Sequence, residues 1–440
     1  MILTGQLHAT HHKAHVPLTF DVPAGTTQLV VRFNASPQRE PGAFFDNLIS
    51  LSLFGPAGPR GARHNNPVWD FAISQTAATP GYLAGKIEPG TWTLYLDCFR
   101  VLGAVTYTVE VACQTTPIAA RPAFVAAKTQ ARGRGWYRGD LHAHTLHSDG
   151  SWSIADLVAW ARGRNLDFMT LTDHNTTSGH AEVHGLAGDD LLTLGGMELT
   201  THWGHAVALG ITHLPEWRVG PVTGQTMPML AADIMDKDGL FVIAHPMSPG
   251  DPACTGCRWE YEDMRPGNAQ LVEIWNGGPW SDYNEAGLAE YRHWLNQGHR
   301  LRATAGSDIH GPEGGVGQVG FNNVEAESLT PKAILQAVHL GRNYLSSGPR
   351  LILQAQLPQG GLASMGETVA QGSVFHAEWQ SQDAALTLSF VDAKGAQSHH
   401  SIAANAAGRA EFAGAEGFVM AELRDAKGLV HAVTNPIFID

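Results

Sequence analysis

Short apolar runs that alternate with helical patterns, from Trp136 to about residue 350, place the strongest constraint on the fold of this chain. Five runs have the length and composition of strands: Phe168–Thr172, Ala206–Ile211, Leu240–Ala244, Leu271–Trp275 and Leu301–Ala305. Helical patterns lie between several of them, at Met229–Asp238, Glu285–Gln297 and Pro331–Gly341. Because strands that alternate with helices are typical of parallel sheets, this region predicts a mostly parallel sheet or a barrel.

The segments on either side have a different pattern, in which strand-like runs are separated by proline and glycine clusters. Thr27–Phe33, Thr91–Leu96 and Thr106–Val111 are examples from the first part of the chain. They predict a β-sandwich over residues 1–134. After Pro349 the strand pattern returns, which predicts a smaller β domain over residues 351–440. The fold prediction is therefore α/β, with a central unit over residues 135–350 between two small β-sandwich domains.

Length and charge narrow the possible functions. A chain of 440 residues divides into about three domains at roughly 150 residues each. Its 28 lysines and arginines against 41 aspartates and glutamates give a net charge of −13, which disfavours a nucleic-acid polymer as partner. No apolar run reaches the roughly 18 residues of a membrane span. The start lacks the pattern of a secretory signal and four cysteines make no disulfide framework, so we expect a cytoplasmic protein.

Histidines and acidic residues stand at the ends of the predicted central strands. Nine of them are candidate metal ligands: His142, His144, Asp149, His174, Glu198, His205, His245, Asp308 and His310. In a barrel of parallel strands, the carboxyl ends of the strands surround one cleft, so these side chains are expected to meet there. One ion takes about four to six ligands, and mixed imidazole and carboxylate donors favour zinc, manganese or iron. The sequence therefore predicts two or three divalent metal ions.

The order of these motifs resembles that of the PHP (polymerase and histidinol phosphatase) superfamily. The motifs that carry the resemblance are Asp140–Thr145 with Ser148–Gly150, Thr172–Asn175, Glu198, His205, Ala244–Pro246 and Gly306–His310. The resemblance implies a distorted (β/α)7 barrel with a two- or three-metal site at the carboxyl ends of its strands. Flanking features, among them Cys254–Trp259 and Val272–Asn276, are similar to those of the carbaryl-hydrolase-like branch.

The resemblance also implies how the ligands divide among the ions. One ion would be bound by His142, His144, Glu198 and Asp308. A second would be bound by Asp149, His174 and His310, and a third by His205 and His245, with Glu198 bridging.

Further residues are weaker candidates for catalysis and substrate binding. His180 could act as a general acid or contact the substrate, with an exposed loop histidine as the alternative. Asp173 is expected to orient a ligand rather than to bind metal. Arg258 is a candidate anchor for an anionic group, and Glu273 and Asn276 are candidates for the pocket lining. Cys254 and Cys257 are interpreted as a reduced pair that shapes the loop after His245.

Three functions remain open from the sequence. The first is a hydrolase that uses a metal-bridging hydroxide, most simply a phosphoesterase on small phosphate mono- or diesters, because a divalent ion lowers the pKa of bound water to about 7. The second is a carbamate or carboxylic-ester hydrolase, and the third is a non-catalytic metal- or ligand-binding protein. The expected partner is a small-molecule substrate without nucleic-acid polymer or membrane, and a homo-oligomer is possible.

Overall fold

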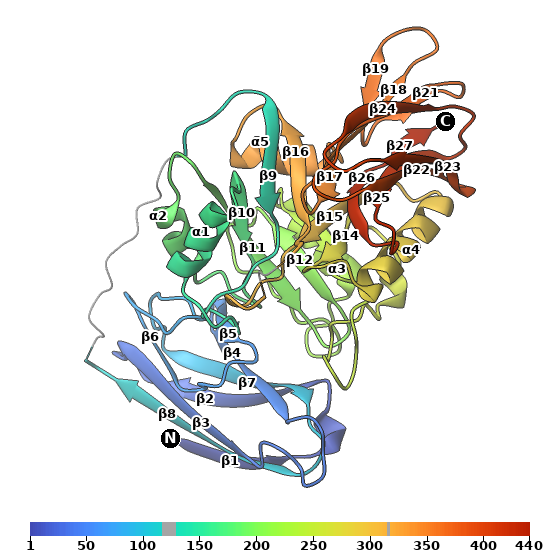
Figure 1. Cartoon of the computed structure of the whole chain (residues 1–440). Coiled ribbons are helices and arrows are strands. Elements are labelled where there is room, and N and C mark those ends of the chain that lie inside the picture. Colours follow the sequence, from blue (N-terminus) through green and yellow to red (C-terminus); the bar gives the residue numbers. More distant parts are fainter. Residues whose placement is uncertain (117–128, 315–316) are drawn as a thin grey trace.

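The computed structural model describes residues 1–116, 129–314 and 317–440. Its first part is a sandwich of two antiparallel four-stranded sheets, drawn in blue in Figure 1. One sheet has the order β1 (Ile2–Leu7), β8 (Val105–Gln114), β3 (Gln28–Ser36) and β6 (Phe71–Ser74). The other has the order β2 (Ala14–Val22), β7 (Gly90–Arg100), β4 (Leu48–Gly55) and β5 (Gly58–Arg63), with a short 3-10 helix at Ala9–His11.

Alternation of buried side chains holds the two sheets of the sandwich together. In β3, Leu29, Val31 and Phe33 are buried while their neighbours are more exposed. Because successive side chains of a strand point to opposite faces, one face of β3 joins the apolar cluster between the sheets.

The central part contains seven strands that are neighbours in chain order. They are β9 (Gly135–Asp140), β10 (Phe168–Leu171), β11 (Leu192–Thr200), β12 (His205–Leu209), β13 (Leu240–Ile243), β14 (Leu271–Asn276) and β15 (Arg302–Gly306). Adjacent pairs are parallel except at β12, which is antiparallel to both neighbours. The helices are α1 (Ile154–Gly163), α2 (His180–Leu186), α3 (Met227–Asp236), α4 (Asp282–Asn296) and α5 (Pro331–His339), with a 3-10 helix at Glu262–Met264.

The predicted (β/α)7 barrel is not confirmed, because no continuous ladder joins β15 to β9 in the described residues. Only a short turn separates β11 from β12, so these two strands run antiparallel without a helix between them. The two ends of the sheet nevertheless meet at one point, where Ala143 forms an isolated parallel bridge with Ile309. The central strands therefore form an open, curled α/β sheet that brings the segments after β9 and β15 together.

The large sheet continues beyond residue 350. From β9 it runs through β16 (Phe321–Ala326), β17 (Asn343–Ser346), β26 (Val430–Thr434), β25 (Phe418–Arg424), β22 (Leu386–Asp392) and β23 (Gly395–Ile402). A further sheet contains β19 (Leu362–Ser364), β18 (Arg350–Gln356), β21 (Val374–Gln380) and β24 (Ala407–Phe412), and β20 (Thr368–Val369) pairs with β27 (Ile437–Ile439). Because β17 pairs with β26, no break in the sheet marks residue 350, and the domain limits at 134 and 350 stay a prediction.

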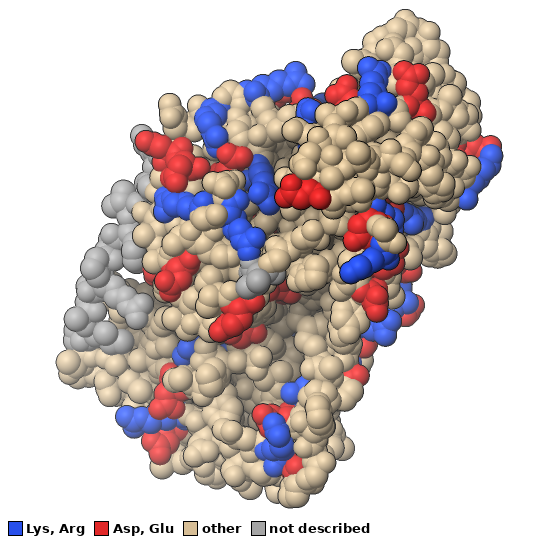
Figure 2. Space-filling view, in the orientation of Figure 1, with Lys and Arg blue, Asp and Glu red and all other residues tan. Residues whose placement is uncertain are grey.

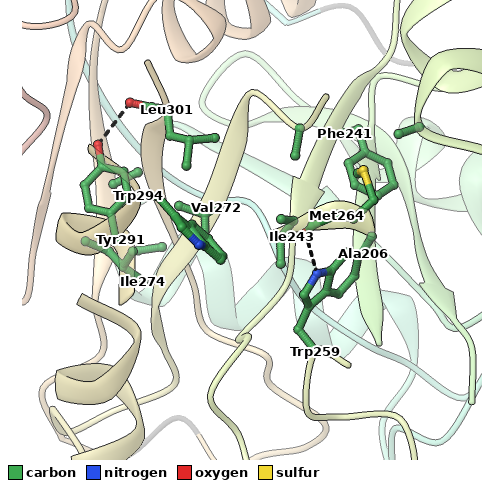
Figure 3. Packing of buried hydrophobic residues seen from close by; sticks show 14 of the residues in the cluster. Ala206, Phe241, Ile243, Trp259, Met264, Val272, Ile274, Tyr291, Trp294 and Leu301 are labelled. Atoms are coloured by element: carbon green, nitrogen blue, oxygen red, sulfur yellow. Dashed lines mark hydrogen bonds between the residues drawn. The ribbon is translucent and has the colours of Figure 1, made fainter. Parts of the chain in front are cut away.

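An apolar cluster fixes β13, β14 and β15 against the helices that cover them (Figure 3). On α4, Tyr291 and Trp294 are buried against this cluster, and the Tyr291 hydroxyl donates a hydrogen bond of 3.1 Å to the carbonyl oxygen of Leu301. Trp259 similarly donates to the carbonyl oxygen of Met264 at 2.8 Å. These contacts hold the strands whose carboxyl ends carry the polar side chains described below.

Charged side chains of both signs are mixed on the surface. Basic and acidic side chains are interspersed on the face shown in Figure 2. Among the described residues, no helix is long and apolar enough to cross a membrane.

Candidate metal centre

The nine candidate ligands of the sequence lie together at the carboxyl ends of the central strands, apart from His205 at the start of antiparallel β12. Three groups have ligand atoms within 4.8 Å of one another: His142, His144, Glu198 and Asp308; His144, Asp149, His174 and His310; and His174, Glu198 and His205. The first group is the one implied for the first ion. The second adds His144 to the implied set, and the third contains His174 where His245 is implied.

Glu198 on β11 is the centre of the cluster. Its Oε2 lies 3.2 Å from Nε2 of His142, 3.3 Å from Nε2 of His144 and 3.0 Å from Nδ1 of His174. Its Oε1 lies 2.9 Å from Nδ1 of His205 and 3.0 Å from Nε2 of His245. Glu198 is only 1% exposed, so one buried carboxylate faces five imidazoles.

Among the described residues, several buried ligand atoms lie close to other ligand atoms but make no hydrogen bond. They are His142 Nε2, both ring nitrogens of His144, Glu198 Oε2, His205 Nε2 and Asp308 Oδ1. A buried polar atom without a partner is costly, so this concentration needs an explanation. Ligand atoms at about 2.1 Å from one ion lie roughly 3 to 3.5 Å apart, which matches the separations around Glu198. The residues therefore fit divalent metal ions.

In three of the histidines, Nδ1 lies within hydrogen-bond distance of an acceptor oxygen. Nδ1 of His142 lies 3.2 Å from both carboxylate oxygens of Glu273. Nδ1 of His245 lies 3.2 Å from the carbonyl oxygen of Cys257, and Nδ1 of His310 lies 2.8 Å from that of Asp308. In each ring the proton is assigned to Nδ1, which leaves Nε2 as a metal donor.

The backbone at the strand ends adopts conformations that non-glycine residues rarely take. Asn175, His245 and Asp308 have φ values of 53°, 27° and 48°. Such conformations persist only where surrounding contacts enforce them. At Asp308 the enforcing contact is its own N–H, which donates to the carbonyl oxygen of His142 at 2.9 Å. At His245 the N–H donates to Glu273 at 3.2 Å.

Two buried aspartates fix the loops that carry ligands. Asp140 accepts from the backbone N–H of Ser307 at 2.9 Å, and burial raises the pKa of its carboxyl to about 6 although these hydrogen bonds oppose the shift. Asp173 accepts from the N–H and hydroxyl of Thr145 and from the hydroxyl of Ser148, at 2.8, 2.7 and 2.7 Å. This arrangement favours the predicted orienting role of Asp173, because its carboxylate holds the turn that precedes Asp149.

Electrostatics keep the acidic ligands ionised. Burial would raise the pKa of Glu198, but the surrounding imidazoles outweigh it and hold that pKa well below its usual value. The same balance lowers the pKa of Asp149 and of Asp308. Burial lowers the pKa of His205 to about 4, so this ring is neutral and free to donate a lone pair.

The substrate-binding candidates divide into two kinds. Glu273 is 3% exposed and bonds to His142 and His245, and Asn276 donates to Glu273 and, at 3.2 Å, to Asp308. These hydrogen bonds favour a role in orienting the candidate ligands, and the place of Glu273 and Asn276 in the pocket lining stays a prediction. Arg258 is exposed and lines a surface groove. Pro246, which directly follows His245, lines the same groove. The anion-binding role of Arg258 stays a prediction.

The loop after β13 contains a disulfide where the sequence analysis expects a reduced pair. Cys254 and Cys257 are bonded, with their Cα atoms 5.5 Å apart, a usual separation for a disulfide. The carbonyl oxygen of Cys257 in this loop lies 3.2 Å from Nδ1 of His245.

His180 lies outside the ligand groups. Its Nε2 donates to the carbonyl oxygen of Gly196 on β11 at 2.8 Å, and burial lowers its pKa to about 4 despite that bond. This geometry favours a structural role, and the catalytic role of His180 stays a prediction.

The pKa of His180 predicts a measurable pH effect. Between about pH 6.5, the ordinary value, and about pH 4, the unfolded chain binds a proton at this residue that the folded chain does not. We expect the unfolding free energy of chelator-treated wild type to fall more steeply over this range than that of His180→Gln, which keeps a donor for Gly196. Denaturant titrations at several pH values measure both slopes. Equal slopes would contradict the buried, neutral state of His180.

The structure also brings residues of the N-terminal sandwich to the cluster, a contact that the sequence does not predict. The ring of His64 lies 4.8 Å from that of His174, measured between centroids. Asn66 donates to the carbonyl oxygen of Ser148 at 2.7 Å, next to Asp149. No pattern in the sequence connects residue 64 to the strand ends, because this contact depends on how the sandwich packs against the central sheet.

Comparisons with known proteins give short or distant similarities. No family model matches the chain. A 3',5'-nucleoside bisphosphate phosphatase of Chromobacterium violaceum is 36% identical over 77 residues, which cover 16% of this chain and 27% of that protein. The matched region thus spans about a quarter of that relative.

Two solved structures are similar at low identity. One is a two-domain protein of Bacteroides vulgatus described as containing a predicted PHP-like metal-dependent phosphoesterase. It is 16% identical, the match covers 72% of this chain and 100% of that chain, and the TM-score is 0.41. The other is an amidohydrolase of Chromobacterium violaceum with bound sulfate and no metal, with 20% identity, 41% and 89% coverage, and a TM-score of 0.32. The carbaryl-hydrolase-like branch has no counterpart among these three proteins and stays a prediction.

Proposed function

We propose that this protein is a metal-dependent hydrolase that acts on small phosphate mono- or diesters. The observation that carries the proposal is Glu198, a buried carboxylate that faces five imidazoles while several of their nitrogens have no hydrogen-bond partner. Short sequence similarity to a nucleoside bisphosphate phosphatase supports the choice of a phosphate ester. Two or three ions of zinc, manganese or iron would be held by the nine ligands, with Glu198 shared between them.

Each part of the site has a role in this reaction. When bound, the ions lower the pKa of water to about 7 and compensate the negative charge of a phosphoryl group. Glu273 and Asn276 keep His142 and Asp308 in place for that purpose. Arg258, in the groove after His245, would bind a second anionic group of the substrate. Since His142, His144 and Glu198 are at most 1% exposed, the site favours a small substrate.

Metal analysis combined with three chromogenic substrates tests the proposal. We expect elemental analysis of the purified protein to give two or three ions per chain. We also expect turnover of p-nitrophenyl phosphate or bis-p-nitrophenyl phosphate, increased by manganese, to exceed turnover of p-nitrophenyl acetate. Selective turnover of the acetate would instead support carbamate or carboxylic-ester hydrolysis. Protein with at most one ion and no turnover would support a binding role.

A double variant links the activity to this site. His142→Ala with Asp308→Ala removes two ligands of the first group, so both metal content and hydrolysis should fall. Asp189→Ala with His293→Ala removes an exposed aspartate and an exposed histidine and serves as the matched control. Hydrolysis that persists in the first variant at the level of the control would rule out this site.

A further inference from the structure

His64 is a seventh histidine at the cluster, and it comes from the N-terminal sandwich rather than from the central strands. It follows β5 directly and is 7% exposed. Its ring lies between Phe99 and His174, at centroid distances of 4.4 and 4.8 Å. It belongs to none of the three ligand groups. The proposed mechanism therefore leaves a buried imidazole next to the centre without a role.

The hydrogen bonds of Ser50 favour one nitrogen of the His64 ring as the donor. The backbone N–H of Asn65 donates to the Ser50 hydroxyl oxygen at 3.2 Å, and the same oxygen lies 3.2 Å from Nδ1 of His64. Because the oxygen already accepts from Asn65, its own hydrogen is available for Nδ1. With this pairing Nδ1 is the acceptor, and we assign the proton of the ring to Nε2. Among the described residues, Nε2 has no hydrogen-bond partner.

Contacts between the sandwich and the ligand loops hold His64 in place. The buried side-chain amide of Asn66 donates to the carbonyl oxygen of Ser148, one residue before Asp149. A second bond runs from the N–H of Gly81 to the hydroxyl of Ser178, at 2.9 Å. The position of His64 relative to His174 and Asp149 is thus set by direct bonds, which is the condition for a precise contact with a ligand.

We propose that His64 is a substrate-binding residue whose Nε2–H donates a hydrogen bond to a phosphoryl oxygen at the His174 and Asp149 side of the centre. This inference rests on the proposed function, since it assigns the group that His64 contacts. The N-terminal sandwich then supplies part of the substrate site.

Two substitutions separate hydrogen bonding from packing. His64→Phe keeps a ring between Phe99 and His174 but removes the donor, whereas His64→Gln keeps an N–H donor. The probe is inorganic phosphate, titrated calorimetrically into metal-loaded protein, with metal content and melting temperature measured for each variant. We expect His64→Phe to bind phosphate about 10-fold more weakly than wild type and to raise KM for aryl phosphates similarly, with unchanged metal content. His64→Gln should stay within about 3-fold of wild type.

Each other result overturns the inference. Phosphate affinity of His64→Phe equal to that of wild type would show that no hydrogen bond is made, and an equal loss in His64→Gln would show that the ring rather than the donor matters. Loss of metal in His64→Phe would make His64 a ligand or a support of one. If His64→Phe does not fold, the second variant is Ser50→Ala, which leaves the His64 ring in place without its orienting hydroxyl. Ser50→Ala must weaken phosphate binding by roughly 3-fold. An unchanged phosphate affinity of Ser50→Ala contradicts the inference.

A failure of the proposed function and a failure of the role of His64 give different results in these measurements. Wild type without phosphoesterase activity would overturn the proposed function, whereas active wild type with an indifferent His64→Phe would overturn only the role of His64.

Discussion

Replacing Glu198 by glutamine is expected to remove bound metal and to abolish hydrolysis. The amide is isosteric with the carboxylate but carries no charge, and it would face five imidazole nitrogens within 3.3 Å. Loss of an outer partner of a metal ligand costs roughly 10- to 100-fold in affinity or activity, so loss of the shared ligand should cost more than about 100-fold. Elemental analysis and competition with a chromogenic chelator measure the metal affinity directly.

The control for this variant is Glu327→Gln, a glutamate of the same central region whose side chain is 69% exposed. It should match wild type in metal content, melting temperature and turnover. Full metal occupancy in Glu198→Gln would contradict the central place that we assign to this carboxylate.

Gly306→Ala is expected to damage both the fold and the site. A Cβ atom at Gly306 would lie far inside van der Waals contact with Cβ of His142 and with a carboxylate oxygen of Glu273. The glutamate could rotate away only by leaving His142, and the backbone of His142 is fixed by its bond to Asp308. Overpacking of this kind costs about 1–3 kcal/mol of unfolding free energy. We expect that loss in denaturant titrations, together with weaker metal binding.

Gly163→Ala is the matched control, because it adds the same methyl group at the last residue of α1, where no described atom beyond the adjacent residues and the backbone of the helix itself lies within 4 Å of the new Cβ. It should be neutral or slightly stabilising. A Gly306→Ala protein as stable and as metal-rich as this control would show that the site has more room than the structure indicates.

Local patterns in the sequence were sufficient to locate most central elements. The runs at Phe168–Thr172, Leu240–Ala244 and Leu301–Ala305 correspond within a residue or so to β10, β13 and β15. The pattern at Glu285–Gln297 corresponds to most of α4. Such runs are buried on both faces in a covered sheet, so their apolar composition is conspicuous. Polar residues stand at the ends of these runs, and this pattern likewise predicts that the nine candidate ligands lie close together.

Pairing between distant segments could not be predicted in the same way. The sequence between β11 and β12 is short, yet only the structure shows that β12 reverses direction and interrupts the parallel order. The contact between His64 and His174 depends on how the N-terminal sandwich packs against the central sheet, and no local sequence pattern around residue 64 predicts it. Glu273 was recognised as a residue of the site, but its role required knowing that it faces His142.

The junction between β17 and β26 has a consequence for how the chain is protected against association. Without β26, the outer backbone N–H and C=O groups of β17 would be left unpaired, and such an exposed edge recruits strands from other molecules. Asn435, just after β26, also donates to the carbonyl oxygens of Ala303 and Asn343, inside the central sheet. We therefore expect the C-terminal strands to protect the central sheet, which carries the candidate metal ligands, from aggregation.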